Sequence, residues 1–247
     1  MGTLRIGCSG WHYPEWVGHF YPLDTPRKEL LRAYACRFST TEINSSFYRV
    51  PTEGTVRRWH DETPDGFLFA WKASRFITHR KRLRDVGDSI AKLMGRMEGL
   101  REKCGPVLWQ LPPLLRRDDD RFAAFLGLLP KRHLHAVEFR HRSWYVEPVF
   151  DLLRSRNVAL CISDHRDAPA PHTLTARHVY VRLHGPGGGY SGSYRKPALA
   201  AWADEIVRWR RTGRSVFVYF DNDRGAAAPR NARTLIDLVS ECRAKVG

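Results

Sequence analysis

The chain has 247 residues, and its 41 basic and 26 acidic side chains give a formal net charge of +15. The length is that of one (β/α)8 barrel of roughly 250 residues, so we expect a single domain over residues 1–247. The five cysteines include no CxxC pair, which excludes a disulfide framework and favours a cytoplasmic protein. The apolar runs are far shorter than the roughly 18 residues of a membrane span, which excludes a membrane partner.

Short apolar runs alternate with helix-like segments along almost the whole chain. In chain order the runs read LRIGCSG, TTEINSSF, FLFAWKAS, PVLWQLPP, HAVEFRH, VALCISD, HVYVRLHG and SVFVYFDND. Alternation of strands and helices is the pattern of a parallel sheet. Eight such strand–helix units in a chain of this length predict an α/β fold, a TIM barrel with eight parallel strands.

Helices are predicted between most of these strands, over residues 25–38, 52–61, 89–104, 118–129, 147–156, 197–213 and 231–244. The connection 165–177 is different, because it contains Pro169 and Pro171 and shows no helical period. We therefore expect the sixth helix to be short or missing. The longest loops follow strands, which places them at the C-terminal face where barrel enzymes bind their substrates.

Polar side chains occupy the ends of the predicted strands. Because side chains alternate along a strand, Glu138 shares a face with Arg140, and Arg182 shares a face with His184. The apolar faces should meet the helices, so the polar faces should point into the mouth of the barrel. This argument predicts one site of mixed charge, formed by Glu42, Asn44, Lys72, Gln110, Glu138, Arg140, Arg182 and His184.

The residue types of this site indicate acid–base chemistry on an anion. Glu42 and Glu138 can serve as acid and base, and His184 can carry a proton between groups. The lysine and the two arginines only donate hydrogen bonds, which suits a phosphate, a carboxylate or a developing oxyanion. The alternative is a closed network in which these charges neutralise one another. If Glu138 is catalytic, Glu138→Gln should leave folding nearly intact.

No cofactor and no metal site are predicted. The chain lacks an HEXXH motif, and its histidines are scattered. A composite site for a divalent cation from Glu42, Glu138, Asp164 and His184 is the less favoured alternative, because three cationic side chains lie close to it.

Loops at the same end of the barrel supply further candidates for binding. Gly187 and Gly188 lie in a glycine-rich loop whose backbone amides can hold a phosphate, and Tyr190 can cover a ligand there. Aromatic side chains near arginine and lysine can stack on bases or sugars, or pack the loops onto the barrel. The aromatic candidates are Trp11, Tyr48 and Trp144.

Several longer segments resemble the YecE-like family, the domain of unknown function 72. They include IGCSGWHYPEWVGHFYP, TEINSSFYRVPTEGTVRRW, TPDGFLFAWKASRFITH, GPVLWQLPP, VEFRHRSW, YVRLHG, VYFDND and GAAAPRNA, and they follow one another from end to end. The resemblance implies a TIM barrel and adds Asn222 and Asn231 to the binding candidates. It brings no established reaction, and its likeness to sugar isomerases and endonuclease-IV-type barrels is one of fold.

Three functions fit these observations. The favoured one is an enzyme acting on a small anionic substrate, phosphorylated or sugar-like, with hydrolase, isomerase and lyase chemistry all open. The second is nucleic-acid binding or processing, which the net charge favours, with the basic run 79–84 as the contact for a phosphate backbone. The third is a non-catalytic interaction module. The oligomeric state stays open.

Overall fold

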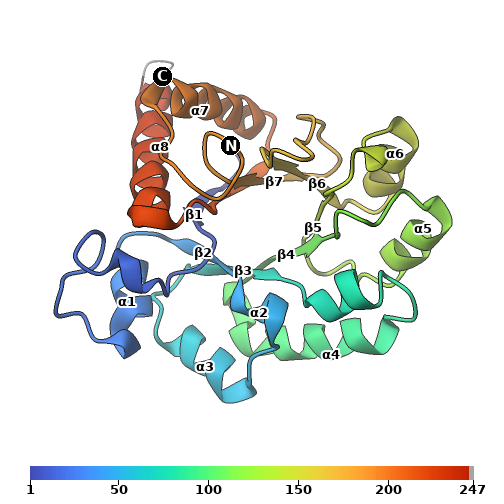
Figure 1. Ribbon diagram of the computed structural model, residues 1–247, viewed down its shortest axis with the longest axis horizontal. Helices are drawn as coiled ribbons and strands as arrows, with labels where there is room; N and C mark the ends of the chain where they lie inside the picture. The colour runs from blue at the N-terminus through green and yellow to red at the C-terminus, as the bar shows by residue number, and fades with distance from the viewer. Residues whose placement is uncertain (245–247) are drawn as a thin grey trace.

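Eight parallel strands form the centre of the computed structural model, which describes residues 1–244 (Figure 1). They pair in the order β1-β8-β7-β6-β5-β4-β3-β2, and a bridge between Ser9 and Glu42 joins the two ends of the sheet. The predicted TIM barrel is thus confirmed. The strands are Leu4–Cys8 (β1), Thr40–Ile43 (β2), Leu68–Lys72 (β3), Cys104–Gln110 (β4), His135–Glu138 (β5), Ala159–Ser163 (β6), His178–Leu183 (β7) and Ser215–Phe220 (β8).

Helices surround the strands and alternate with them along the chain (Figure 1). Between β6 and β7 the described residues contain no helix, as predicted from the two prolines of that connection. The α-helices are Leu30–Ala35 (α1), Ser45–Tyr48 (α2), Glu53–Asp61 (α3), Gly87–Met97 (α4), Asp119–Gly127 (α5), Glu147–Ser155 (α6), Lys196–Arg211 (α7) and Ala227–Ala244 (α8).

Three helices differ most from their predicted bounds. The helix predicted from residue 25 begins at Leu30, and Arg27–Glu29 before it form a 3-10 turn. The helix predicted over 89–104 ends at Met97 and is followed by a 3-10 segment, so Cys104 already belongs to β4. The last helix begins at Ala227 rather than at Asn231. Its Pro229 lies in the first turn, where the amide has no intrahelical acceptor to lose.

The barrel interior is filled by side chains of unequal size. Small residues such as Ala70, Ala136 and Ala159 come from β3, β5 and β6, and the rings of Tyr180 and Phe217 from β7 and β8 fill the space they leave. A separate and larger apolar cluster packs the outer faces of the strands against the helices. The inward faces therefore form a solid core, as in other TIM barrels, and their last residues emerge at the mouth.

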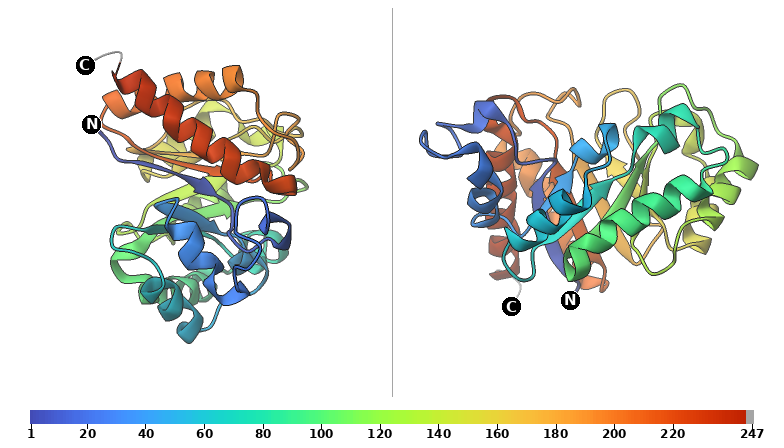
Figure 2. Two further views of the ribbon diagram at one scale, coloured as in Figure 1. Left: turned by 90° about the vertical axis from the view of Figure 1, so that its left-hand side faces the viewer. Right: turned by 90° about the horizontal axis from the view of Figure 1, so that it is seen from below.

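The mouth lies at the end of the barrel opposite the N-terminus. Figure 2 (right) shows the N-terminus at the lower end, and α2 and the segment after β3 at the upper end. Loops after strands form this upper surface, which is the face that carries the site in TIM barrels. No helix within residues 1–244 has the length and apolar character needed to cross a membrane.

Candidate active site

Arg182 is the centre of the charged cluster at the mouth. Its guanidinium is fully buried and pairs with three carboxylates, at 2.9 Å from Glu42, 2.9 Å from Glu138 and 2.7 Å from Asp221. Each of the three carboxylates belongs to a different strand or strand end, so the cluster joins β2, β5 and β8 to β7, which carries Arg182. A buried charge of this kind is tolerated because its partners neutralise it and accept its hydrogen bonds.

Glu42 has no oxygen left for a ligand. Besides Arg182, its carboxylate accepts hydrogen bonds of 2.6 Å from the Ser9 hydroxyl and 2.6 Å from the Tyr180 hydroxyl. Its side chain is fully buried. The catalytic role predicted for Glu42 stays a prediction, and the contacts favour a role in holding Arg182.

Glu138 and His184 lie on the other side of the same guanidinium. Glu138 contacts Arg140 Nη2 at 2.7 Å and accepts a hydrogen bond from Ser163. Burial alone would raise the pKa of Glu138, but the charges of Arg140 and Arg182 outweigh it and hold that pKa well below its ordinary value. Glu138 is therefore a stable anion in this arrangement.

The ring nitrogens of His184 have different partners. Nε2 lies 3.1 Å from Arg182 Nη1 and 3.2 Å from Arg140 Nη2, and guanidinium nitrogens can only donate. Nε2 therefore accepts these bonds, and the ring proton resides on Nδ1, 3.2 Å from Asp164 Oδ1. We call Arg182, Glu42, Glu138, Asp221 and His184 the closed half of the mouth, because they satisfy one another.

The ends of β2, β3 and β4 form an open half of the mouth. Lys72 keeps 8% of its surface exposed, and its Nζ lies 4.7 Å from the centre of the Phe47 ring without an ion pair or hydrogen bond to the described residues. Burial, and then the charge of Arg182, lower the pKa of Lys72 to about 8. Asn44 Oδ1 and Gln110 Oε1, at the ends of the neighbouring strands, are buried acceptors without a donor.

Tyr190 covers the border between the two halves. Its hydroxyl accepts a 2.9 Å hydrogen bond from Arg140 Nη1, and its ring lies edge to face with His184. The residue is 41% exposed, and Arg140 Nε beneath it has no acceptor. Tyr190 thus occupies a donor position of Arg140 that an oxyanion would take.

The glycine-rich loop after β7 is tightly folded. Gly188 has a φ of +63°, and a Cβ there would lie 2.4 Å from the Arg166 nitrogen, so glycine is required. Its amide donates to the Gly185 carbonyl at 2.7 Å, and the Gly185 amide donates to the Tyr194 hydroxyl. These two amides are occupied. Gly187 lies between them and has open space around its Cα.

Asn222 and Asn231 fix the other end of this loop. Asn222 Nδ2 donates to the Gly192 carbonyl and to Asn231 Oδ1, and Asn231 accepts the Tyr194 amide. Both side chains are buried. Their positions favour holding the loop over direct contact with a ligand.

The three aromatic candidates have different surroundings. Trp144 is 1% exposed, stacks on Phe139 and donates to the Leu115 carbonyl, so it packs the helix layer. Tyr48 lies at the end of α2 on the surface. Trp11 packs edge to face on Trp59 at a ring distance of 5.4 Å.

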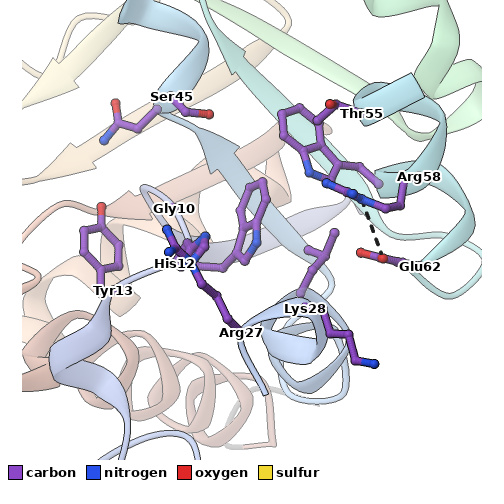
Figure 3. Close-up of a pocket in the computed structure, with 13 residues that line it drawn as sticks. Gly10, His12, Tyr13, Arg27, Lys28, Ser45, Thr55, Arg58 and Glu62 are labelled. Atoms are coloured by element: carbon purple, nitrogen blue, oxygen red, sulfur yellow. Dashed lines mark hydrogen bonds and ion pairs between the residues drawn. The ribbon is translucent and has the colours of Figure 1, made fainter. Parts of the chain in front are cut away.

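Trp11 and Trp59 line a cavity of about 800 Å³ beside the mouth. Figure 3 shows this cavity with Tyr13, Arg27 and Arg58 among the residues that line it. Lys28 also lines it, and Asn44 belongs both to this cavity and to the open half of the mouth. The link is direct, because Asn44 Nδ2 lies 3.4 Å from Asp221 Oδ1. The cavity is therefore an extension of the site rather than the charged cluster itself.

Some residues of the cluster were not among the predicted site residues. Tyr180 could have been found by alternation, since it shares a strand face with Arg182. Ser9 and Ser163 carry no such signal, because a serine at a strand end has no distinctive pattern. Asp223, whose pKa burial and Asp221 raise to about 8, lies after β8, where the strand period ends.

The described part of the chain contains no group of three His, Cys, Asp or Glu side chains placed to hold a metal ion. Arg140 and Arg182 occupy the space between the carboxylates, where a cation would need to bind. The residues present therefore fit charge pairing better than metal coordination.

A parallel eight-stranded barrel with its polar strand ends gathered at one mouth defines a TIM-barrel protein. Residues 5–246 match the family described as "Protein of unknown function DUF72", and the chain belongs to this family. This agrees with the resemblance that the sequence motifs indicated.

Relatives match over nearly their full length. The chain is 25% identical to YecE of Escherichia coli K12, covering 99% of this chain and 95% of YecE, and 25% identical to YunF of Bacillus subtilis, covering 96% and 94%. A DUF72 protein of Thermotoga maritima has the same fold, with a TM-score of 0.86 and 23% identity over 96% of this chain and 99% of that one.

Proposed function

We propose that this protein is an enzyme that uses acid–base chemistry on a small anionic substrate at the C-terminal mouth of the barrel. The observation that carries the proposal is Lys72, a buried amine without an ion-pair partner beside a cluster in which every other charge is paired. An unpaired buried charge is costly, and a site retains such a group where its chemistry is used.

Lys72 is the group we assign to proton transfer. A pKa of about 8 lets it both hold and release a proton near neutral pH, which is the condition for an efficient acid or base. Glu138 holds Arg140 and Arg182 in place as a permanent anion. His184 is assigned to positioning Arg140, which it contacts through Nε2.

The substrate we propose carries both an anionic group and hydroxyl groups. Arg140 Nη1 would bind the anionic oxygen in the position that the Tyr190 hydroxyl holds. Asn44 Oδ1 and Gln110 Oε1 are acceptors without donors, and substrate hydroxyl groups would supply them. Phosphorylated sugars and sugar acids have this combination of groups.

The closed half of the mouth is the feature expected of a non-catalytic interaction module. It seals only the part of the mouth around Arg182, and the unsatisfied groups at the ends of β2, β3 and β4 favour an enzyme over such a module.

The test is incubation of the protein in D2O with a panel of phosphorylated sugars, sugar acids and small hydroxy acids, followed by proton NMR. We expect one class of compound to lose C–H signal or to give product signals. Lys72→Met, which keeps the length of the side chain and removes the amine, should slow this change by about 10²–10⁴-fold.

Two controls make the result specific. Lys72→Arg keeps the positive charge but cannot release a proton, so it should be as slow as Lys72→Met. Glu102→Gln, at an exposed position in the segment that precedes β4, whereas the mouth residues lie at the strand ends, should react like the wild type. A panel that is unchanged by the wild type, or changed equally fast by Lys72→Met, would refute the proposal.

A further inference from the structure

The segment that follows β3 carries an unusual density of unpaired positive charge. Arg75, Arg80, Lys81, Arg82 and Arg84 are all exposed, and none forms an ion pair with another described residue. Some exposed arginines elsewhere do have partners, for example on α6, where Arg154 contacts two acids of its own helix. Like charges held together without counter-charges attract anions.

Aromatic rings lie among these charges. Tyr48 is 71% exposed and Phe76 is 40% exposed. The Arg75 guanidinium lies 5.9 Å from the centre of the Tyr48 ring, and that of Arg80 lies 5.6 Å from the Phe76 ring. Proteins that bind single-stranded nucleic acid stack the unpaired bases on exposed aromatic rings and bind the phosphates with nearby cations. We call Tyr48 and residues 75–84 the β3 rim.

The backbone of the β3 rim holds these side chains outward. Phe76–Arg80 form a π-helical turn, and Arg82 and Leu83 follow with φ angles of +49° and +69°. Residues other than glycine rarely adopt such angles, and they do so where the surrounding structure enforces them. Leu83 is buried and anchors the turn, so its charged neighbours point to solvent.

The β3 rim adjoins the open half of the mouth. The Phe47 ring lies 4.7 Å from Lys72 Nζ and 5.0 Å from the His79 ring, so α2 and the segment after β3 meet there. Figure 2 (right) shows both at the upper end of the barrel.

We propose that the β3 rim is a binding surface for single-stranded nucleic acid. Phosphates would contact the unpaired cations, and bases would stack on Tyr48 and Phe76. A single strand is favoured over a duplex because only unpaired bases present their faces to aromatic rings. A small phosphate is disfavoured because the cations are spread along an open surface rather than gathered in a pocket. The inference does not depend on the chemistry proposed for Lys72.

The experiment measures fluorescence anisotropy of fluorescein-labelled 20-nucleotide oligo(dT) and oligo(rU) and of a 20-base-pair DNA duplex, with the full chain. The single strands should bind more tightly than the duplex. The triple variant Arg80→Gln, Lys81→Gln, Arg84→Gln should weaken single-strand binding by about 10- to 100-fold near 0.1 M salt. It should also reduce the slope of log K against log salt concentration by about 2, because each lost phosphate contact removes about 0.7.

Matched variants separate this surface from the overall charge. Arg208→Gln, Arg211→Gln, Arg233→Gln removes the same charge from exposed positions on α7 and α8 and should weaken binding by less than about twofold. Tyr48→Ala should weaken single-strand binding by about tenfold, and Tyr48→Phe, which keeps the ring, should not. Circular dichroism melts would show that each variant is folded.

Several results would overturn the proposal. Equal losses in the two triple variants would assign binding to net charge alone. Equal affinity for the duplex, for heparin or for vesicles of phosphatidylglycerol and phosphatidylcholine would show a general polyanion surface. A Tyr48→Ala variant that binds like the wild type would remove the stacking contact, and absence of binding at 0.05 M salt would remove the surface altogether.

Discussion

At the scale of the residue, two cations of the mouth differ in their partners. Arg182 is fully buried and has three carboxylates around it, whereas Lys72 is almost as buried and has only the face of the Phe47 ring. The three carboxylates therefore offset the free-energy cost of burying the Arg182 charge, whereas no ion pair offsets that cost for Lys72. This difference is why the pKa of the lysine falls to about 8 and why we assign the chemistry to it.

Replacement of Lys72 by methionine should stabilise the protein at pH 7. The folded-state pKa of about 8 lies below the unfolded value of about 10.4, so the folded protein carries an unfavourable charge at every pH below 8. Lys72→Met should raise the free energy of unfolding by about 1–3 kcal/mol, which is several degrees in Tm. Urea denaturation at a series of pH values measures this.

The pH dependence of that gain has a definite sign. Between pH 8 and about 10.4 the unfolded wild type binds more protons than the folded wild type, so wild-type stability rises with pH there. The advantage of Lys72→Met should therefore shrink over this window. A variant less stable than the wild type at pH 7 would show that the amine has a partner that stabilises its charge.

At the scale of the element, the cluster around Arg182 connects β7 to β2 and β5, which are not its neighbours in the sheet, as well as to the end of the neighbouring β8. β2 and β7 are both attached to it through buried ion pairs, with β5 and the end of β8 as further attachments. The geometry makes Glu138 a partner of both Arg140 and Arg182, at 2.7 and 2.9 Å. A catalytic Glu138 without such ion pairs could be replaced by glutamine with little effect on folding. These two contacts lead us to expect a larger effect.

Glu138→Gln should accordingly destabilise the barrel. The change leaves two buried guanidinium groups without their anion, and breaking such a pair costs about 3–5 kcal/mol in the free energy of unfolding. The folded-state pKa of Glu138 is depressed, so its contribution is complete above pH 4–5 and is lost as pH falls toward the folded-state value. The difference from wild type in urea denaturation should shrink below about pH 4.

Glu147→Gln on α6 is the matched control, because Glu147 pairs with Arg154 on the surface. Its effect should stay below about 1 kcal/mol. Equal and small effects at Glu138 and Glu147 would contradict the buried network.

The sequence predicted the strands better than the helix ends. Strand period and charged tips are local signals, and they placed Glu42, Lys72, Glu138 and Arg182 on inward faces, where the structure has them. Helix starts depend on where the preceding loop packs, which is why α1 begins at Leu30 and not at residue 25. The short α2 and the π-helical turn after β3 have no local period that would predict them.

The roles of the site residues depend on distances that a sequence does not contain. Alternation placed Arg182 among anion-binding residues, yet which acids surround it follows from the closure of the barrel. The same holds for Trp144, whose position after β5 is compatible with the mouth or with the helix layer until Phe139 is placed beneath it.

At the scale of the whole molecule, the groups to which we assign the proposed chemistry lie on one side of the barrel mouth. The closed half is centred on β7. Asn44, Lys72 and Gln110, each with a terminal polar atom that lacks a partner among the described residues, lie at the ends of β2, β3 and β4, next to the β3 rim. A net charge of +15 would attract anions to any part of the surface, but this side combines unpaired cations with a cavity lined by Trp11 and Arg27. On the proposed function, this arrangement would direct an anionic ligand toward Lys72.

The most direct test of this account is a pH titration of Lys72 by carbon-13 NMR in protein labelled at the lysine Cε, with the signal assigned by its absence in Lys72→Arg. We predict a midpoint near pH 8 for Lys72 and values near 10.4 for the exposed lysines. A midpoint of 10 or above for Lys72 would mean that its charge is paired or solvated, and the assignment of the open half of the mouth as an acid–base site would be wrong.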